Sequence, residues 1–278
     1  MRKILIILIL QFIVIEAFAS IERIKLHSFD NLVDQIKNDT IKGKDVLIVF
    51  DIDGVILCPK DSYLSHNNRE VRHKFLDDIE KSQGLAQRKN IYALIAAQME
   101  YKLIEPSLMK HFWFLKFNGY NVIALTSMGP NNPYFDQEQD RVDMLKDKGL
   151  LFDKRYHGQI KIDKQKRPQP KAIEGVIFAR GYEKGLVLKA YLDQQHTAYS
   201  KIVVIDDKPQ NLDSIEKHLK NQIGKIVLVE YSYDKFVEQK FTNNISTLQQ
   251  NFLKTQSIWL SDKQASVLLQ MRNKAKVE

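Results

Sequence analysis

Acidic and hydroxyl side chains stand directly after three short apolar runs of the chain. The runs cover 46–50, 122–125 and 202–205, and the residues at their ends are Asp51, Asp53, Thr126, Asp206 and Asp207. Carboxylates that converge on one point repel one another, and they stay ionised where a cation offsets their charge. Hard oxygen ligands of this kind favour Mg²⁺. The residue types therefore predict a magnesium site if the ends of these runs meet in space.

The three runs, together with a fourth at 226–229, have the composition of buried strands. They are rich in β-branched residues and lack the apolar/polar alternation of a half-exposed strand. Helical patterns lie between them, for example Leu212, Ile215 and Leu219 after Pro209. This alternation predicts an α/β fold with a doubly wound parallel sheet. In such sheets ligands bind beyond the carboxyl ends of the strands, which is where the acidic residues stand.

A plainer interpretation is that Asp and Gly mark ordinary transitions from strand to loop, as they often do. Gly54 fits both interpretations, because it permits a turn directly after Asp53. The plainer interpretation requires three run ends to be polar by coincidence. The shared site explains all three at once, so it is the interpretation we prefer.

In order and in residue type, these positions resemble the four motifs of the haloacid dehalogenase-like (HAD) superfamily. The matching positions are residues 51–55 for the first motif, Thr126 for the second, Lys184 for the third, and Asp206 with Asp207 for the fourth. Lys189 is a rival for the third motif, but the Lys184-Gly185 pair, which opens a predicted helix before the acidic strand, resembles the family more closely, so we prefer Lys184. Asn211 departs from the pattern, because the family often has an aspartate there that supports the metal-site loop.

The resemblance implies a phosphatase that works through an aspartyl-phosphate intermediate. In that mechanism Asp51 is the nucleophile, Asp53 is the general acid and base, and Thr126 and Lys184 contact the phosphoryl group. The implied cofactor is Mg²⁺, held by the four carboxylate residues Asp51, Asp53, Asp206 and Asp207, with Asp53 contributing its backbone carbonyl. The implied partner is a small phosphorylated substrate, which makes the chain a phosphomonoester hydrolase.

About seventy residues separate Asp53 from Thr126, which is long for one crossover between parallel strands. Residues 85–102 have apolar residues at helical spacing, and Pro106 opens a second helical pattern. This segment resembles the helical cap that many HAD proteins insert after the first motif, and we place the cap at about 60–105. The connection from 129 to 180 is also long, and the sequence predicts no role for it.

The first nineteen residues have the pattern of a secretory signal peptide. A basic start precedes an apolar run over 4–15, and the small residues Ala17 and Ala19 precede Ser20. The apolar run is shorter than the ~20 residues of a membrane-spanning helix. We therefore expect a bacterial protein that is periplasmic or secreted, with a single catalytic domain over 20–278 and no membrane span after cleavage. A retained anchor is the alternative.

Composition excludes several other classes of protein. The 278 residues carry 42 Lys and Arg against 34 Asp and Glu, a net charge of +8, but the basic residues are mixed with acidic ones. This pattern does not predict a specific nucleic-acid surface. Cys58 is the one cysteine, so an internal disulfide is excluded, and the Cys and His spacings match no zinc site.

Three other functions fit part of the pattern. A receiver domain also combines paired acids, Asp, Thr and Lys, but here the paired acids come last and Asp53 would have no role. A dehalogenase would not need the acid at Asp53. A catalytically silent HAD-like binding protein or secreted effector would keep the fold and lose turnover, and it is the main alternative. The sequence predicts neither the identity of the substrate nor the oligomeric state.

Overall fold

The computed structural model describes most of the chain after the predicted signal peptide. The described residues are 20–37, 43–65, 68–130, 132–155, 157–162, 167–221, 224–233 and 242–275. The predicted signal peptide, residues 1–19, lies outside them. No helix among the described residues is long and apolar enough to cross a membrane.

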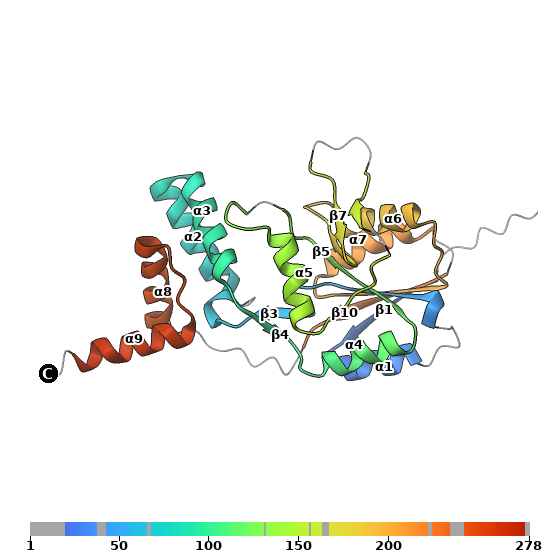
Figure 1. The fold of residues 1–278 in the computed structure, drawn as a ribbon, viewed down its shortest axis with the longest axis horizontal. Coiled ribbons are helices and arrows are strands. Elements are labelled where there is room, and N and C mark those ends of the chain that lie inside the picture. Colours follow the sequence, from blue (N-terminus) through green and yellow to red (C-terminus); the bar gives the residue numbers. More distant parts are fainter. Residues whose placement is uncertain are drawn as a thin grey trace, which may run out of the picture.

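An eight-stranded sheet forms the centre of the molecule (Figure 1). In spatial order its strands are β1 (Ser20–Leu26), β10 (Lys225–Tyr231), β9 (Lys201–Asp206), β2 (Val46–Phe50), β5 (Asn121–Thr126), β8 (Val176–Phe178), β7 (Lys171–Ile173) and β6 (Gly158–Gln159). Every pairing from β1 to β8 is parallel, whereas β7 and β6 pair antiparallel at one edge. The predicted α/β fold with a mostly parallel sheet is confirmed, with two antiparallel strands added at that edge.

Helices cover both faces of the sheet, which explains why its central strands are apolar throughout. All residues of β2 are buried: Val46, Ile48 and Phe50 face one apolar cluster, and Leu47 and Val49 face the other. The first cluster includes α1 (Phe29–Lys37), α4 (Leu108–Phe117) and α5 (Gln137–Asp147), and the second includes α6 (Lys184–Gln195) and α7 (Pro209–Leu219). Because both faces are packed, the carboxyl edge of the sheet is where polar residues gather.

Between β2 and β5, the elements that come before α4 form a group of their own. It contains a hairpin of β3 (Leu57–Pro59) and β4 (Tyr101–Leu103), a short turn of helix η2 (Ser62–Leu64), and the helices α2 (Arg69–Gln83) and α3 (Leu85–Gln98). The helix expected over 85–102 therefore ends at Gln98. Residues beyond it pair with β3, because an antiparallel partner satisfies their backbone groups.

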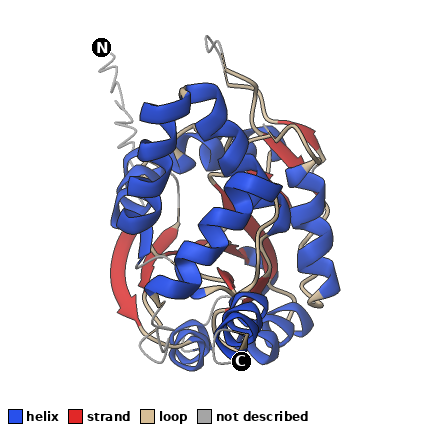
Figure 2. Cartoon of the chain, turned by 90° about the vertical axis from the view of Figure 1, so that its left-hand side faces the viewer, coloured by secondary structure: helices blue, strands red, loops and turns tan. Residues whose placement is uncertain are grey.

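The C-terminal helix α8 (Asn243–Gln256) packs against α3, and α9 (Asp262–Lys274) packs against α8 (Figure 1). Figure 2 views the molecule from this side, with helices in front of the sheet. Trp259 and Leu253 are buried in one apolar cluster with Tyr63, Phe75 and Ile91. Segments from the middle and from the end of the chain thus share one core, distinct from the two clusters on the sheet.

Candidate functional site

Asp51 is the first residue beyond β2, and its carboxylate is fixed by two donors. Its backbone N–H donates to the carbonyl of Ile205 at 2.8 Å, which extends the pairing of β2 with β9 by one residue. The side chain is buried, and Oδ1 accepts from the backbone N–H of Ile52 at 2.7 Å and from Nζ of Lys184 at 2.7 Å. The strand therefore ends with a carboxylate held in one orientation.

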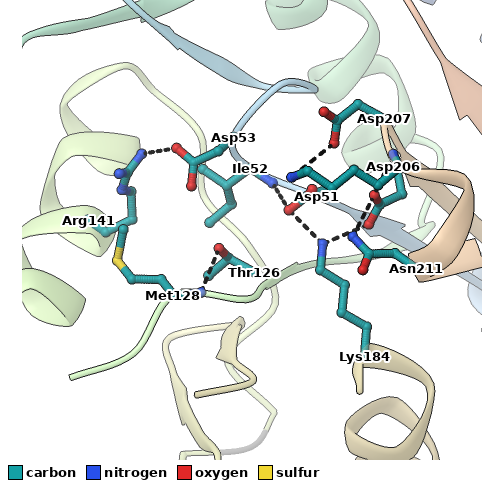
Figure 3. Close-up of polar contacts among 11 residues, drawn as sticks. Asp51, Ile52, Asp53, Thr126, Met128, Arg141, Lys184, Asp206, Asp207 and Asn211 are labelled. Carbon is teal, nitrogen blue, oxygen red and sulfur yellow. Dashed lines mark hydrogen bonds and ion pairs between the residues drawn. The ribbon is translucent and has the colours of Figure 1, made fainter. Parts of the chain in front are cut away.

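Lys184, the first residue of α6, lies between two of the predicted acids (Figure 3). Its Nζ is 2.7 Å from Oδ1 of Asp51 and 2.7 Å from Oδ2 of Asp206. Burial lowers the pKa of Lys184, but the two carboxylates outweigh burial and the pKa is raised, so the ammonium stays charged. The rival Lys189 pairs with Asp193 on the exposed side of α6. Of the two candidate lysines, Lys184 is the one in the site.

Asp206, the last residue of β9, is held by the loop that follows it. Its Oδ1 accepts from the backbone N–H of Lys208 at 2.9 Å and from Nδ2 of Asn211 at 2.8 Å. Asn211 departs from the pattern of the resembled family, yet its amide acts as a donor to the first acid of the pair. The departure therefore leaves Asp206 supported.

Three of the predicted acids form one compact group. Carboxylate oxygens of Asp51, Asp206 and Asp207 all lie within 4.8 Å of one another. Burial raises the pKa of Asp51 to about 7, Lys184 opposes this rise, and the charges of Asp206 and Asp207 add to it. A divalent cation among these oxygens would offset their repulsion, and an all-oxygen donor set suits Mg²⁺. The residues present therefore fit the implied magnesium ion.

Gly54 lets the chain turn closely past Asp207. Its φ is +96°, a value that side chains rarely adopt, and a Cβ placed on it would lie 2.5 Å from Oδ2 of Asp207. Both the backbone conformation and the close approach therefore require glycine here.

Asp53 has its side chain turned away from the acidic group and toward α5 (Figure 3). Its Oδ1 accepts from Nη1 of Arg141 at 2.9 Å, and the side chain is 43% exposed. The carboxylate is not part of the group formed by Asp51, Asp206 and Asp207. The predicted contribution of Asp53 to a metal through its backbone carbonyl stays a prediction.

Thr126 ends β5 at the same edge of the sheet and is buried. Its Oγ1 accepts from the backbone N–H of Met128 at 3.2 Å. Because this bond uses the hydroxyl oxygen as acceptor, the hydroxyl hydrogen can donate to an anion. This geometry suits the predicted contact with a phosphoryl oxygen.

Two residues near Asp53 were not predicted from the sequence. Arg141 on α5 is buried, and its guanidinium carbon lies 4.2 Å from the centre of the Tyr101 ring. A start signal for α5 is readable at Asp136, which accepts hydrogen bonds from the backbone N–H groups of Glu138 and Gln139. A charged residue on a helix is usually solvated, so the sequence did not predict that Arg141 is buried.

The fold and the site together define a class: an α/β protein with a buried lysine and a compact group of three carboxylates at the carboxyl edge of a mostly parallel sheet. A family model described as "Protein of unknown function (DUF2608)" matches residues 25–266, and the chain belongs to that family. No curated protein matches the sequence. A solved structure from Burkholderia xenovorans LB400, described as a "putative haloacid dehalogenase-like hydrolase", is similar at 10% identity and a TM-score of 0.36. The match covers 71% of this chain and 99% of that one.

Proposed function

We propose that this protein is a Mg²⁺-dependent phosphomonoester hydrolase of HAD type that works through an aspartyl-phosphate on Asp51. One observation carries the proposal. The buried carboxylate of Asp51 shares Lys184 with Asp206, and it lies within 4.8 Å of the carboxylates of Asp206 and Asp207. A nucleophilic carboxylate needs this kind of surrounding: a fixed orientation, a neighbouring cation and room for a metal ion.

In the proposed reaction, two residues perform the bond changes. Oδ1 of Asp51 is held by Ile52 and Lys184, so we assign the attack on phosphorus to Oδ2. A bond forms between Oδ2 and phosphorus as the bond to the leaving oxygen breaks, and Asp53 donates a proton to that oxygen. Asp53 then takes a proton from water, which attacks phosphorus and releases phosphate and free Asp51.

Two further residues handle the charge of the phosphoryl group. Lys184 offsets the charge of the nucleophile and of the phosphoryl oxygens, and Thr126 donates its hydroxyl hydrogen to one of them. Mg²⁺, when bound by Asp51, Asp206 and Asp207, supplies further charge neutralisation.

Phosphate release by the purified protein tests the proposal. The assay uses a panel of phosphomonoesters, with Mg²⁺ or with EDTA, and compares the wild type with Asp51→Asn and with the surface variant Asp193→Asn. We expect release that requires Mg²⁺, falls at least about 1,000-fold in Asp51→Asn and is unchanged in Asp193→Asn. A folded wild type that binds Mg²⁺ and releases no phosphate from any ester would instead favour the catalytically silent binding protein.

We further propose that the inserted elements between β2 and β5 act as a cap over the site. The hairpin of β3 and β4 connects directly to the first acidic motif, and Tyr101 of β4 lies against Arg141 near Asp53. A cap in this place would exclude water during phosphoryl transfer and contact the leaving group.

We also propose that the protein is exported. The pattern of residues 1–19 supports this, and cleavage after Ala19 would make Ser20 the amino terminus of the mature chain. The backbone nitrogen of Ser20 donates to the carbonyl of Gly224 at 3.1 Å, a hydrogen bond that a new amino terminus can keep.

A further inference from the structure

Arg141 is a buried cation beside the proposed acid and base. It lies on α5, is 4% exposed, and donates from Nη1 to Oδ1 of Asp53 at 2.9 Å (Figure 3). Removing a guanidinium from water is costly unless an anion and hydrogen bonds compensate for the lost hydration. At this position Asp53 is the anion that the structure places against Arg141.

The surroundings of Arg141 hold its guanidinium in one place. The ring of Tyr101 lies 4.2 Å from the guanidinium carbon, a cation–π contact that also packs the flat face of the group. One turn earlier on α5, Glu138 forms two hydrogen bonds with Arg180, at 2.7 and 2.6 Å. These contacts fix α5 against the loop before Lys184, and they fix Arg141 against the hairpin that carries Tyr101.

Among the residues that the structure describes, Arg141 is the hydrogen-bond partner of the Asp53 side chain. That side chain is 43% exposed and stands directly before the turn at Gly54. An aspartate with two rotatable bonds at such a position would otherwise sample several orientations. A proton donor must meet the leaving oxygen within hydrogen-bond distance, so loss of one orientation would slow the reaction.

We infer that Arg141 is a positioning residue that holds the carboxylate of Asp53 at the leaving oxygen of the substrate, and that Tyr101 supports Arg141 in this role. This role rests on the proposed function and adds to it two residues that act through Asp53. Nη1 of Arg141 donates to Oδ1, which can accept in both the carboxylate and the carboxylic acid, so Asp53 gains and loses its proton at Oδ2. Arg141 also joins the helix that follows the second motif to the hairpin of the inserted segment.

The test compares two esters that differ in their need for an acid. 4-Nitrophenyl phosphate releases a stable anion and needs little proton donation, whereas glycerol 1-phosphate releases an alkoxide and needs much. For Arg141→Met we expect kcat/KM to fall about 100-fold on glycerol 1-phosphate and less than about 10-fold on 4-nitrophenyl phosphate. Arg141→Lys should recover part of the loss, because a lysine keeps the charge without the planar fork. Tyr101→Leu should show the same preference with a smaller effect.

A double-mutant cycle separates positioning from direct contact with the substrate. If Arg141 acts through Asp53, the double variant Arg141→Met with Asp53→Asn should be no slower than Asp53→Asn alone. Arg23→Met is the matched control, because Arg23 pairs with Asp213 and Glu216 on the surface. This variant should leave kcat/KM for both esters unchanged. Circular dichroism and thermal unfolding of each variant establish that it is folded.

Several results would overturn the inference while leaving the proposed function intact. These are an active wild type with unchanged or faster turnover in Arg141→Met, an equal loss on both esters, or a full additional loss in the Asp53→Asn background. The last result would make Arg141 a substrate-binding residue. A wild type that hydrolyses neither these esters nor any other would overturn the proposed function, and the inference with it.

Discussion

At the scale of single residues, the site is organised around an excess of negative charge. Asp51, Asp206 and Asp207 share one region with Lys184, whose buried ammonium contacts two of the three carboxylates. Nζ of Lys208 lies 3.7 Å from Oδ1 of Asp207, but the Lys208 side chain is 42% exposed, so water largely screens its charge. Without a further cation, repulsion among these carboxylates lowers the stability of the fold, and pH and metal ions should change that loss.

Asp51→Asn is expected to raise the unfolding midpoint, Tm, in EDTA at pH 8. The pKa of Asp51 is about 7 in the fold against an ordinary value of 3.8. A raised carboxyl pKa means that stability is fully present below about 4 and is lost as pH rises through about 7. The amide removes that charge, and a gain of about 1 kcal/mol corresponds to ~2–4 °C in a chain of this size. Differential scanning calorimetry at pH 5 and pH 8 measures the effect, which should shrink at pH 5.

Added Mg²⁺ should make the wild type more stable than Asp51→Asn, the reverse of the order expected in EDTA at pH 8. At 100 times its dissociation constant, a cation that binds the folded state stabilises it by about 2.7 kcal/mol. The wild type should gain this and Asp51→Asn should gain much less, while Asp193→Asn should behave as the wild type. Equal gains for the wild type and Asp51→Asn would contradict the proposed role of Asp51 as a Mg²⁺ ligand.

Gly54→Ala should lower the affinity for Mg²⁺ as well as the stability of the fold. The added Cβ would meet Oδ2 of Asp207 at 2.5 Å, so that carboxylate must move. Gly84 is a matched control, because its φ of +88° is similar and its Cβ would have no neighbour within 4 Å. Both variants should lose about 1–3 kcal/mol from backbone strain at a positive φ. In a calorimetric titration, only Gly54→Ala should also lose affinity for Mg²⁺, and an equal loss in Gly84→Ala would contradict the prediction.

At the scale of elements, the sequence predicted those parts of the fold that carry a regular pattern. The apolar runs became β2, β5, β9 and β10, because strands packed on both faces need apolar residues at every position. The polar run ends could be grouped in advance, because parallel strands bring their carboxyl ends to one edge. Lys184 could be placed through the motif order and its position at the start of a helix.

Elements whose place depends on contacts distant in sequence were not predictable in this way. Strand β4 is three residues long and is stabilised by its pairing with β3. The helical spacing over 85–102 therefore predicted a helix where the first residues of this strand lie. Arg141 is an exception to the rule that charged helix residues face water, and its burial follows from Asp53, which is 88 residues away in sequence. The attachment of the C-terminal segment likewise depends on pairs about 200 residues apart, since Asp61 accepts hydrogen bonds from Trp259 and Asp262.

Trp259→Ala should loosen this helical group and leave the sheet intact. The Trp259 indole is buried, donates from Nε1 to Oδ2 of Asp61 at 2.8 Å, and stacks on Tyr63 with ring centres 5.8 Å apart. Loss of such a side chain costs about 3–5 kcal/mol. Hydrogen exchange should become faster in α2, α3 and α8 and stay slow in β2 and β9.

Ile258 provides the control for that experiment, because it is the adjacent residue and is half-exposed. Ile258→Ala should change stability by less than about 0.5 kcal/mol and leave the exchange pattern unchanged. Uniformly faster exchange across the sheet in Trp259→Ala would show that the helical group and the sheet unfold as one cooperative unit.

At the scale of the whole molecule, β1 is the edge strand of the sheet that follows the predicted signal peptide in sequence. Strand β1 pairs with β10 along its full length, from Ser20 opposite Lys225 to Leu26 opposite Tyr231. A chain that begins at Ser20 would therefore keep every residue of this edge strand. Cleavage after Ala19, as proposed, would leave the described pairing of β1 with β10 in place.

Ala19→Arg should consequently block processing without affecting the fold. Signal cleavage needs a small residue directly before the cut, and arginine does not meet that requirement. In cells of a bacterial host, intact-mass measurement should find the wild type beginning at Ser20 and Ala19→Arg retaining residues 1–19. Ser20→Ala is the control and should be processed as the wild type. A wild type recovered with Met1 in the membrane fraction would favour the retained anchor, and one recovered with Met1 in the cytoplasm would contradict export altogether.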